Sequence, residues 1–175
     1  MAGSLPNSGA AASSDPSVQS KYEAPMSLPS LACPHLLDVS GDRPRLLGSR
    51  CAECDETYFP GAMSCTRCLS TRMQACDLGS AGTLWSWTIQ GFLPKPPYNS
   101  GETPESFKPY GVGYVEMACG LKVESRLTVA DPAALHIGMP MALTLVPYRI
   151  DDTGQPVSTF AFEPADSAEK AHHHG

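Results

Sequence analysis

The sequence predicts a mainly β protein in which a small cysteine-rich ribbon precedes a five-stranded barrel. Two Cys-x-x-Cys pairs lie close together within residues 51–68, a spacing typical of metal-binding knuckles. From residue 82 onward, five segments alternate apolar and polar residues, as half-buried strands do. A short segment with helix-capping residues separates the third of these strands from the fourth. Together these observations predict two β modules in series.

Length and charge narrow the class of protein. The chain has 175 residues and a net charge of -6, with 12 Lys and Arg against 18 Asp and Glu. This length accommodates one domain, or a small module beside a domain of about 100 residues. The acidic balance argues against nucleic acid or anionic lipid as the general partner. No run of residues has the length and apolar character of a membrane span, and the first 20 residues lack a secretory signal.

Two predicted segments precede the ribbon. Residues 1–24 are rich in Ser, Ala, Gly and Pro, so we expect a disordered tail there. Residues 25–45 form an N-terminal arm that mixes apolar residues with prolines, and we expect a short helix around Leu36 to Val39. This arm is either laid across a partner or folded as a strap over its own domain. A flexible tail is expected again at residues 165–175.

The predicted zinc ribbon spans residues 46–78. Four thiolates suit a tetrahedral, closed structural zinc site, and the candidate ligands are Cys51, Cys54, Cys65 and Cys68. Between them, TYFPG favours a tight hairpin that turns at Pro60 and Gly61. Because we expect the chain in the reducing cytoplasm, we favour metal over disulfides for its seven cysteines. Iron held in rubredoxin fashion, which would make the protein an electron carrier, is the alternative metal.

The remaining cysteines and the single histidines carry no predicted role. We expect Cys33, Cys76 and Cys119 to be small buried residues, because no His or Asp lies at a recognisable catalytic spacing from them. We expect His35 and His136 to be packed or solvated. The sequence therefore predicts no catalytic residue in this chain.

The barrel is predicted at residues 79–164. Its expected strands are residues 82–90, 112–117, 121–129, 141–146 and 157–162. In the first strand, alternation puts Trp85, Trp87 and Ile89 on one face, which we expect to be the core.

A short helix is expected in ADPAALHIG, where Asp131 caps the start and Pro132 takes the first helical position. Gly138 suits the helix exit. Three strands, a helix and two strands is the order of an OB-fold. An antiparallel sandwich would need seven or more strands, for which the chain has no room.

A long loop joins the first two barrel strands. Residues 91–110 contain five prolines and four aromatic residues, a composition typical of a stiff contact surface. The first inter-strand loop of an OB-fold commonly lines the ligand face. The alternative is a loop folded back over the mouth of the barrel.

Arginines gather in the ribbon. Five of the seven arginines fall in residues 43–72, which contain three acids, so the ribbon is predicted to be locally basic. An arginine cluster grips phosphates of a nucleotide-like cofactor, or carboxylates on a partner. A ribbon followed by an OB-fold also occurs in nucleic-acid binders. Against that function, the barrel strands have few basic residues and the two tryptophans are expected in the core.

A series of motifs resembles one known family. These are RLLGSRCAEC, the following TYFP, the second Cys-x-x-Cys, GTLWSWT, PYGVGYVEM, LHIGMPMALTL and TFAFEP. They are similar to proteins that join a rubredoxin-like zinc ribbon to an OB-fold, formerly a domain of unknown function, over residues 43–164. The resemblance implies a non-catalytic accessory subunit of thiolase-superfamily enzymes, including acyl-CoA thiolases and aldolases, or of hydratases. It implies an α2β2 hetero-oligomer whose partner carries the catalytic Cys and His and binds most of the CoA thioester.

The resemblance also implies contacts and a substrate class. The ribbon and barrel of the family help shape the partner's active-site entrance or CoA site. The candidate partner- or CoA-contacting residues here are Phe92, Lys95, Tyr98, Phe107, Tyr110, Arg50 and Arg67. The PYGVGYVEM loop ending resembles the subset that acts in steroid side-chain or aromatic-compound degradation, with a benzoylsuccinyl-CoA thiolase of toluene breakdown as one candidate.

Three positions depart from the pattern of the family. Asp55 and Leu69 stand where its knuckles usually have Gly or another small residue, and Thr66 replaces a frequent Pro. A left-handed backbone at these knuckle positions would suit Leu69 worst, because a branched side chain tolerates positive φ poorly. None of the three departures removes a metal ligand.

Overall fold

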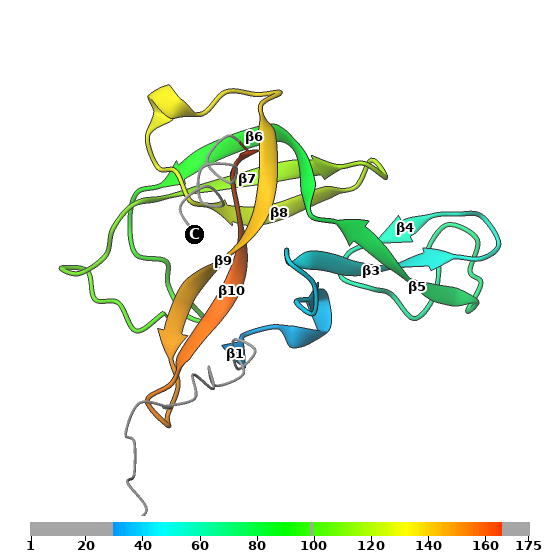
Figure 1. Cartoon of the computed structure of the whole chain (residues 1–175), viewed down its shortest axis with the longest axis horizontal. Coiled ribbons are helices and arrows are strands. Elements are labelled where there is room, and N and C mark those ends of the chain that lie inside the picture. The colour runs from blue at the N-terminus through cyan, green and yellow to red at the C-terminus, as the bar shows by residue number, and fades with distance from the viewer. Residues whose placement is uncertain (1–29, 99, 166–175) are drawn as a thin grey trace, which may run out of the picture.

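The computed structural model describes residues 30–98 and 100–165 as two β-sheets that share one hydrophobic core (Figure 1). The predicted tail at residues 1–24 lies outside this range, as does the predicted tail at 165–175 except for its first residue. Within the described range, the structure contains no helix with the length and hydropathy needed to cross a membrane.

The ribbon forms the smaller sheet. Its strands are β2 (Leu37–Asp38), β3 (Arg45–Cys51), β4 (Thr57–Tyr58) and β5 (Met73–Gly79). β3 is central: β5 runs antiparallel along its whole length, while β2 and β4 pair with its beginning and its end. The sheet therefore holds the two cysteine pairs at one end, where β3 finishes and β5 begins.

The barrel is closed by five strands. These are β6 (Ala81–Gln90), β7 (Tyr110–Met117), β8 (Lys122–Leu127), β9 (Pro140–Ile150) and β10 (Pro156–Pro164). The pairings run β9–β6–β7–β8–β10 and return from β10 to β9, and only the β8–β10 pair is parallel. This order and closure confirm the predicted OB-fold architecture.

The predicted helix between the third and fourth barrel strands is one 3-10 turn, η2 (Pro132–Ala134). Asp131 caps it as expected, with its carboxylate accepting from the Ala133 N–H at 2.9 Å. The turn stays short because the chain must return at once to β6. There the Gly138 N–H donates to Leu84 O at 2.8 Å, and the φ of 89° at Gly138 permits the bend.

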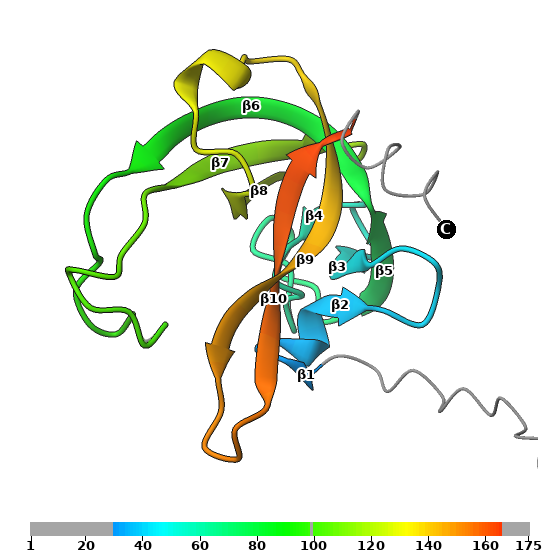
Figure 2. The same cartoon turned by 60° about the vertical axis from the view of Figure 1, so that its left-hand side comes forward.

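From residue 30 onward, the N-terminal arm is a strap over its own domain, while residues 25–29 of the predicted arm lie outside the described range. β1 (Ser30–Leu31) pairs in parallel with β10, and β2 pairs with β3, so the arm ties the barrel to the ribbon. Figure 2 shows it beside the lower part of β10. The helix expected around Leu36 to Val39 is instead a 3-10 turn, η1 (Pro34–Leu36). The helix ends there because Leu37 becomes extended and pairs with Leu46.

The core runs from the barrel into the ribbon. Leu46 and Leu78 of the ribbon belong to the same buried cluster as Leu84, Val115 and Phe162 of the barrel. At its edge, Phe59 of the ribbon contacts Phe160 of β10 edge to face, with ring centroids 6.0 Å apart. The two modules are therefore packed against each other by side chains as well as by the strap.

Trp85 lies outside this core, so the expectation from simple alternation is wrong for this residue. The pairing of β6 with β7 shifts register between Leu84 and Ser86, which marks a β-bulge. The bulge buries Leu84 completely and leaves Trp85 50% exposed. Farther along β6, Trp87 and Ile89 pack against the core as predicted.

Candidate metal centre and contact surface

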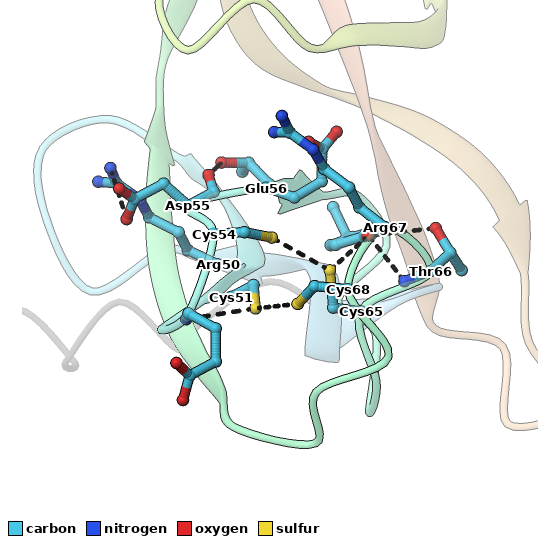
Figure 3. A network of polar contacts seen from close by, with 12 residues as sticks. Arg50, Cys51, Cys54, Asp55, Glu56, Cys65, Thr66, Arg67 and Cys68 are labelled. Carbon is cyan, nitrogen blue, oxygen red and sulfur yellow. Dashed lines mark hydrogen bonds and ion pairs between the residues drawn. The ribbon is translucent and has the colours of Figure 1, made fainter.

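The structure brings the four predicted ligands together. Their Sγ atoms all lie within 4.8 Å of one another, with Cys51 to Cys68 and Cys54 to Cys65 each at 3.5 Å (Figure 3). A tetrahedral zinc with Zn–S bonds of about 2.3 Å separates its sulfurs by roughly 3.8 Å. Four thiols at this spacing, two of them buried, fit a closed zinc site.

Two matching turns form the knuckles. The Asp55 N–H donates to Cys51 O at 3.0 Å, and the Leu69 N–H donates to Cys65 O at 2.9 Å. Both turns end in a left-handed residue, with φ of 62° at Asp55 and 63° at Leu69. The departures from glycine noted in the sequence are therefore accommodated without a change of knuckle geometry, at a conformational cost that is greater for leucine.

Tyr58 supports the metal centre and was missed as a functional residue by the sequence reasoning. Its hydroxyl lies 3.2 Å from Cys65 Sγ and accepts a hydrogen bond from the Thr66 N–H at 2.9 Å. The hydrogen bond between the Tyr58 hydroxyl and Cys65 Sγ is the largest cause that lowers the pKa of Cys65 to about 6. A hydroxyl that donates a hydrogen bond to a thiolate fixes the position of this metal ligand and favours its charged form. The only signal in the sequence was an aromatic residue in TYFP, between the two knuckles.

Four of the five arginines in residues 43–72 are paired with acids, so the predicted basic patch is largely neutralised. Salt bridges join Arg50 to Asp55 at 3.1 Å, Arg67 to Glu56 at 3.2 Å and Arg72 to Glu53 at 2.6 Å. Arg45 binds two acids that lie outside residues 43–72, Asp38 at 3.0 Å and Asp77 at 2.9 Å. The prediction of a basic patch counted only the acids within residues 43–72, so it missed Asp38 and Asp77 as partners of Arg45.

The long loop, residues 91–109, is partly folded onto the barrel. Tyr98 donates to Glu102 at 2.9 Å, and Phe107 contacts Tyr110 edge to face at 5.9 Å. Phe92, 72% exposed, and Lys95, also exposed, project from the same loop. The loop therefore contacts the start of β7 through Phe107, is held together internally by Tyr98 and Glu102, and presents Phe92 to solvent.

A cavity of about 330 Å³ is lined by this loop and by strands β7, β8, β9 and β10 of the barrel. Tyr98 and Tyr110 line it together with Tyr148 and Phe160, and Arg126 supplies a positive charge. The Arg126 guanidinium lies over the Tyr110 ring, 4.1 Å from its centroid. This is the face on which OB-folds bind ligands. Sequence reasoning missed Arg126, because only the pairing of Arg126 with Val112 places it beside the loop.

Exposed aromatic residues extend this face across β7 and β6. Trp85 contacts Tyr114 edge to face at 6.4 Å, and Lys122 Nζ lies 5.0 Å from the Trp85 ring centroid. Tyr114 donates to Glu124 at 3.0 Å. We call Trp85, Tyr98, Tyr110 and Tyr114 the aromatic face. Acidic and basic groups alternate along it, so its charge is mixed.

The other cysteines and histidines take no part in these sites. Cys33 and Cys76 are half-buried, whereas Cys119 is exposed, which corrects the expectation that all three are buried. Cys119 follows β7 in the tight turn that leads to β8, where Gly120 donates to Met117 O. His35 and His136 are exposed, in line with the solvated role expected for them.

Two family models match the chain in the order of its modules. Residues 40–74 match the model described as ChsH2, rubredoxin-like zinc ribbon domain, and residues 76–146 match ChsH2, C-terminal OB-fold domain. A solved structure described as Ltp2-ChsH2(DUF35) aldolase is 26% identical, with a TM-score of 0.51, and the alignment covers 69% of this chain and 85% of that one.

Curated relatives give similar names. A DUF35 domain-containing scaffold protein of Methanocaldococcus jannaschii is 23% identical over 70% of this chain and 83% of its own length. Its counterpart in Pyrococcus furiosus is 29% identical over 71% and 87%. A probable enoyl-CoA hydratase alpha subunit of Thermomonospora curvata is 27% identical over 57% of this chain, but the match spans only 28% of that protein.

Proposed function

Because this chain belongs to the family that joins a ChsH2-type rubredoxin-like zinc ribbon to a ChsH2-type OB-fold domain, we propose that it is a non-catalytic accessory subunit of an acyl-CoA enzyme complex. The names of its relatives support this role, since they describe scaffold proteins, an enzyme subunit and a two-component aldolase. The aromatic face carries the proposal. Exposed Trp and Tyr beside mixed charges have the composition of a protein interface.

The ribbon holds a structural Zn2+ through Cys51, Cys54, Cys65 and Cys68 in this proposal. Support comes from the sulfur separations and from the match to a zinc ribbon model. A set of four protein ligands leaves no open position for substrate, so the ion stabilises the fold and takes no part in catalysis. The paired thiols suit a reducing compartment, and we place the complex in the cytoplasm.

The partner is a thiolase-superfamily enzyme, a thiolase or an aldolase, in an α2β2 assembly. The aldolase named in the similar structure and the PYGVGYVEM resemblance support this class. The substrate is an acyl-CoA from aromatic-compound degradation, such as benzoylsuccinyl-CoA, or from steroid side chains. The catalytic Cys and His lie on the partner.

The long loop and its cavity form part of the CoA or acyl-CoA entrance. Tyr98 and Tyr110 offer flat apolar walls, and Arg126 offers a cation that pairs with a phosphate or carboxylate. Phe92 and Lys95 are positioned to contact the partner from the exposed part of the loop. The partner binds most of the CoA molecule, because a cavity of about 330 Å³ is at the small end of the range for ligand sites.

A nucleic-acid-binding OB-fold is the second candidate function. The exposed aromatic face favours it, because bases stack on Trp and Tyr rings. The neutralised ribbon arginines and the acids Glu116 and Glu124 on the same face disfavour it. A rubredoxin-like redox role would require iron in the same four-cysteine site.

Co-expression separates these functions. The full chain is produced with candidate thiolase, aldolase and hydratase subunits, and the purified material is assayed for CoA-dependent cleavage and for bound metal. We expect a stable complex whose enzymatic activity is lost when this chain is omitted. Thioester turnover by this chain alone would overturn the accessory role. Tight, salt-sensitive oligonucleotide binding without a protein partner would favour the second function.

A further inference from the structure

The two knuckles place different residues at matching backbone positions. Asp55 and Leu69 each follow the last cysteine of a pair, and each donates its N–H back to the first cysteine of that pair. Their φ angles are 62° and 63°. Aspartate tolerates this left-handed conformation because its short polar side chain bonds locally, whereas leucine does not.

The side chain of Asp55 forms an ion pair within the chain, whereas the side chain of Leu69 is largely uncovered by the described residues. The Asp55 carboxylate pairs with Arg50 at 3.1 Å. The Leu69 residue is 82% exposed, so the described part of the chain gives it little apolar cover. Leu69 is therefore both conformationally unfavourable and solvated. A strained residue that is largely uncovered by the described residues points to a contact with another molecule.

A second exposed apolar residue lies just before the same knuckle in the sequence. Met63, 93% exposed, lies two residues before Cys65, and the Cys65 N–H donates to Ser70 O at 2.8 Å, which closes the segment that carries Leu69. Long, unbranched methionine side chains adapt to apolar pockets of irregular shape. The second knuckle thus presents Leu69 on a hydrogen-bonded turn, and Met63 is exposed on the segment that leads into this turn.

We propose that Leu69, assisted by Met63, is an apolar anchor that inserts into a hydrophobic pocket of the catalytic subunit. This inference rests on the proposed function, because that subunit is the partner of the proposed complex. The knuckle is a second contact region, in addition to the aromatic face and the long loop that carries Tyr98 of that face. Figure 1 shows the ribbon and the long loop at opposite ends of the barrel, so the two regions grip the partner at separate points.

The charges beside the knuckle favour a protein over a phosphate-bearing partner. Arg67 is paired with Glu56 at 3.2 Å and Arg72 with Glu53 at 2.6 Å, so the arginines nearest to Leu69 in sequence are already neutralised. Phosphates of a nucleic acid or a lipid headgroup would require cations that are free to pair. An aliphatic side chain among neutralised charges is instead stabilised by removal from water in an apolar pocket.

The test measures binding of the catalytic subunit that co-purifies with the wild-type chain. Leu69→Asn keeps a residue that tolerates positive φ but removes the apolar side chain, Leu69→Met keeps the apolar side chain, and Asp55→Asn is the matched control on the other knuckle. We expect Leu69→Asn to raise the Kd at least about tenfold, as loss of a buried anchor does. The other two variants should bind as the wild type does.

Two further measurements keep the result interpretable. Zinc content and the midpoint of chemical unfolding of the isolated full chain should be unchanged or higher in Leu69→Asn, because asparagine relieves the backbone strain. Wild-type affinity in Leu69→Asn would overturn the anchor and leave the proposed function standing. Equal losses in Leu69→Asn and Asp55→Asn would also overturn it, as would self-association of the wild-type chain through Leu69. Failure of the wild-type chain to form any complex would overturn the proposed function and the anchor together.

Discussion

The hydroxyl of Tyr58 lies 3.2 Å from Sγ of Cys65, which links the hairpin between the knuckles to the metal centre. The Thr66 N–H donates to the same hydroxyl at 2.9 Å, and this contact orients the hydroxyl. Tyr58 is thus held from one side and donates to the thiolate on the other. Groups that orient a metal ligand in this way raise the affinity of the site for its metal.

Replacing Tyr58 by Phe should weaken zinc binding by about 10- to 100-fold. The ring still fills its place in the hairpin, but the hydrogen bond that lowers the pKa of Cys65 is lost. Competition with a chromogenic chelator measures the affinity. Tyr98→Phe, which removes a hydroxyl from the barrel loop, serves as the control and should leave zinc binding unchanged. Equal zinc affinities for Tyr58→Phe and the wild type would show that the Tyr58 hydroxyl does not contribute to zinc binding.

Metal removal should loosen the ribbon more than the barrel. Cys51 ends β3, and Cys65 and Cys68 precede β5, so the ion clamps the end of the ribbon sheet. We expect metal analysis to return about one zinc per chain, and chelation to speed hydrogen exchange in β3 and β5 before β7 and β8. A red, iron-containing protein that cycles between redox states would contradict the zinc assignment.

Replacing Phe92 or Tyr98 by Ala should weaken assembly with the catalytic subunit by about 1 to 3 kcal/mol in each single variant. Both side chains belong to the long loop, and Phe92 is largely exposed in the isolated chain. Ile150→Ala, at a similarly exposed position at the end of β9, is the control. Calorimetric titration gives the affinities. If neither loop variant changes the binding, the loop does not belong to the interface.

Asp38 should titrate well below an ordinary aspartate. The Ser40 hydroxyl donates to its carboxylate at 2.6 Å, the Ser40 N–H donates at 3.0 Å, and Arg45 pairs with it, which lowers its pKa from 3.8 to about 2. Because the folded pKa is depressed, this stabilisation is present above pH 3.8 and is lost as the pH falls through about 2. NMR titration of the Asp38 carboxyl checks the value. Ser40→Ala should raise it, and Ser100→Ala should not.

Gly113 should tolerate no side chain. A Cβ at this position in β7 would lie 2.8 Å from Ser86 O and 3.0 Å from Leu84 Cδ1, at the bulge that exposes Trp85. We expect Gly113→Ala to reduce the free energy of unfolding by about 1 to 3 kcal/mol in chemical denaturation. Gly91→Ala is the matched control, since nothing lies within 4 Å of its added Cβ. Similar unfolding midpoints for both variants would contradict this prediction, because they would show that β6 and β7 can move apart to admit the methyl group without loss of stability.

Local signals in the sequence predicted the parts of the structure that depend on local spacing. The four cysteines could be paired into one site because each knuckle turn is a few residues long. Alternation located all five barrel strands, and the Asp131 cap located the turn between β8 and β9. In each case the residues that decide the structure are neighbours in the chain.

The errors arose where distant segments decide the structure. Trp85 is exposed because β6 pairs with β7 through a bulge, and no residue within β6 announces that bulge. The ribbon arginines are neutralised partly by Asp38 and Asp77, which β2 and β5 bring to either side of Arg45. Arg126 reaches the cavity only through the register of β7 and β8. Pairing between strands, and not composition, fixes these contacts.

The strap sets a practical limit on where this protein can be shortened. Its pairing residues, 30–38, precede residue 40, where similarity to the zinc ribbon model begins. A fragment trimmed to the region of similarity would lose β1 and β2 together, uncovering backbone on β10 and β3 that would then be open to intermolecular strand addition. It would also lose Leu36 and Leu37 from the core. The first residue of any recombinant version should therefore be chosen from strand partnership in the fold and not from the limits of sequence similarity.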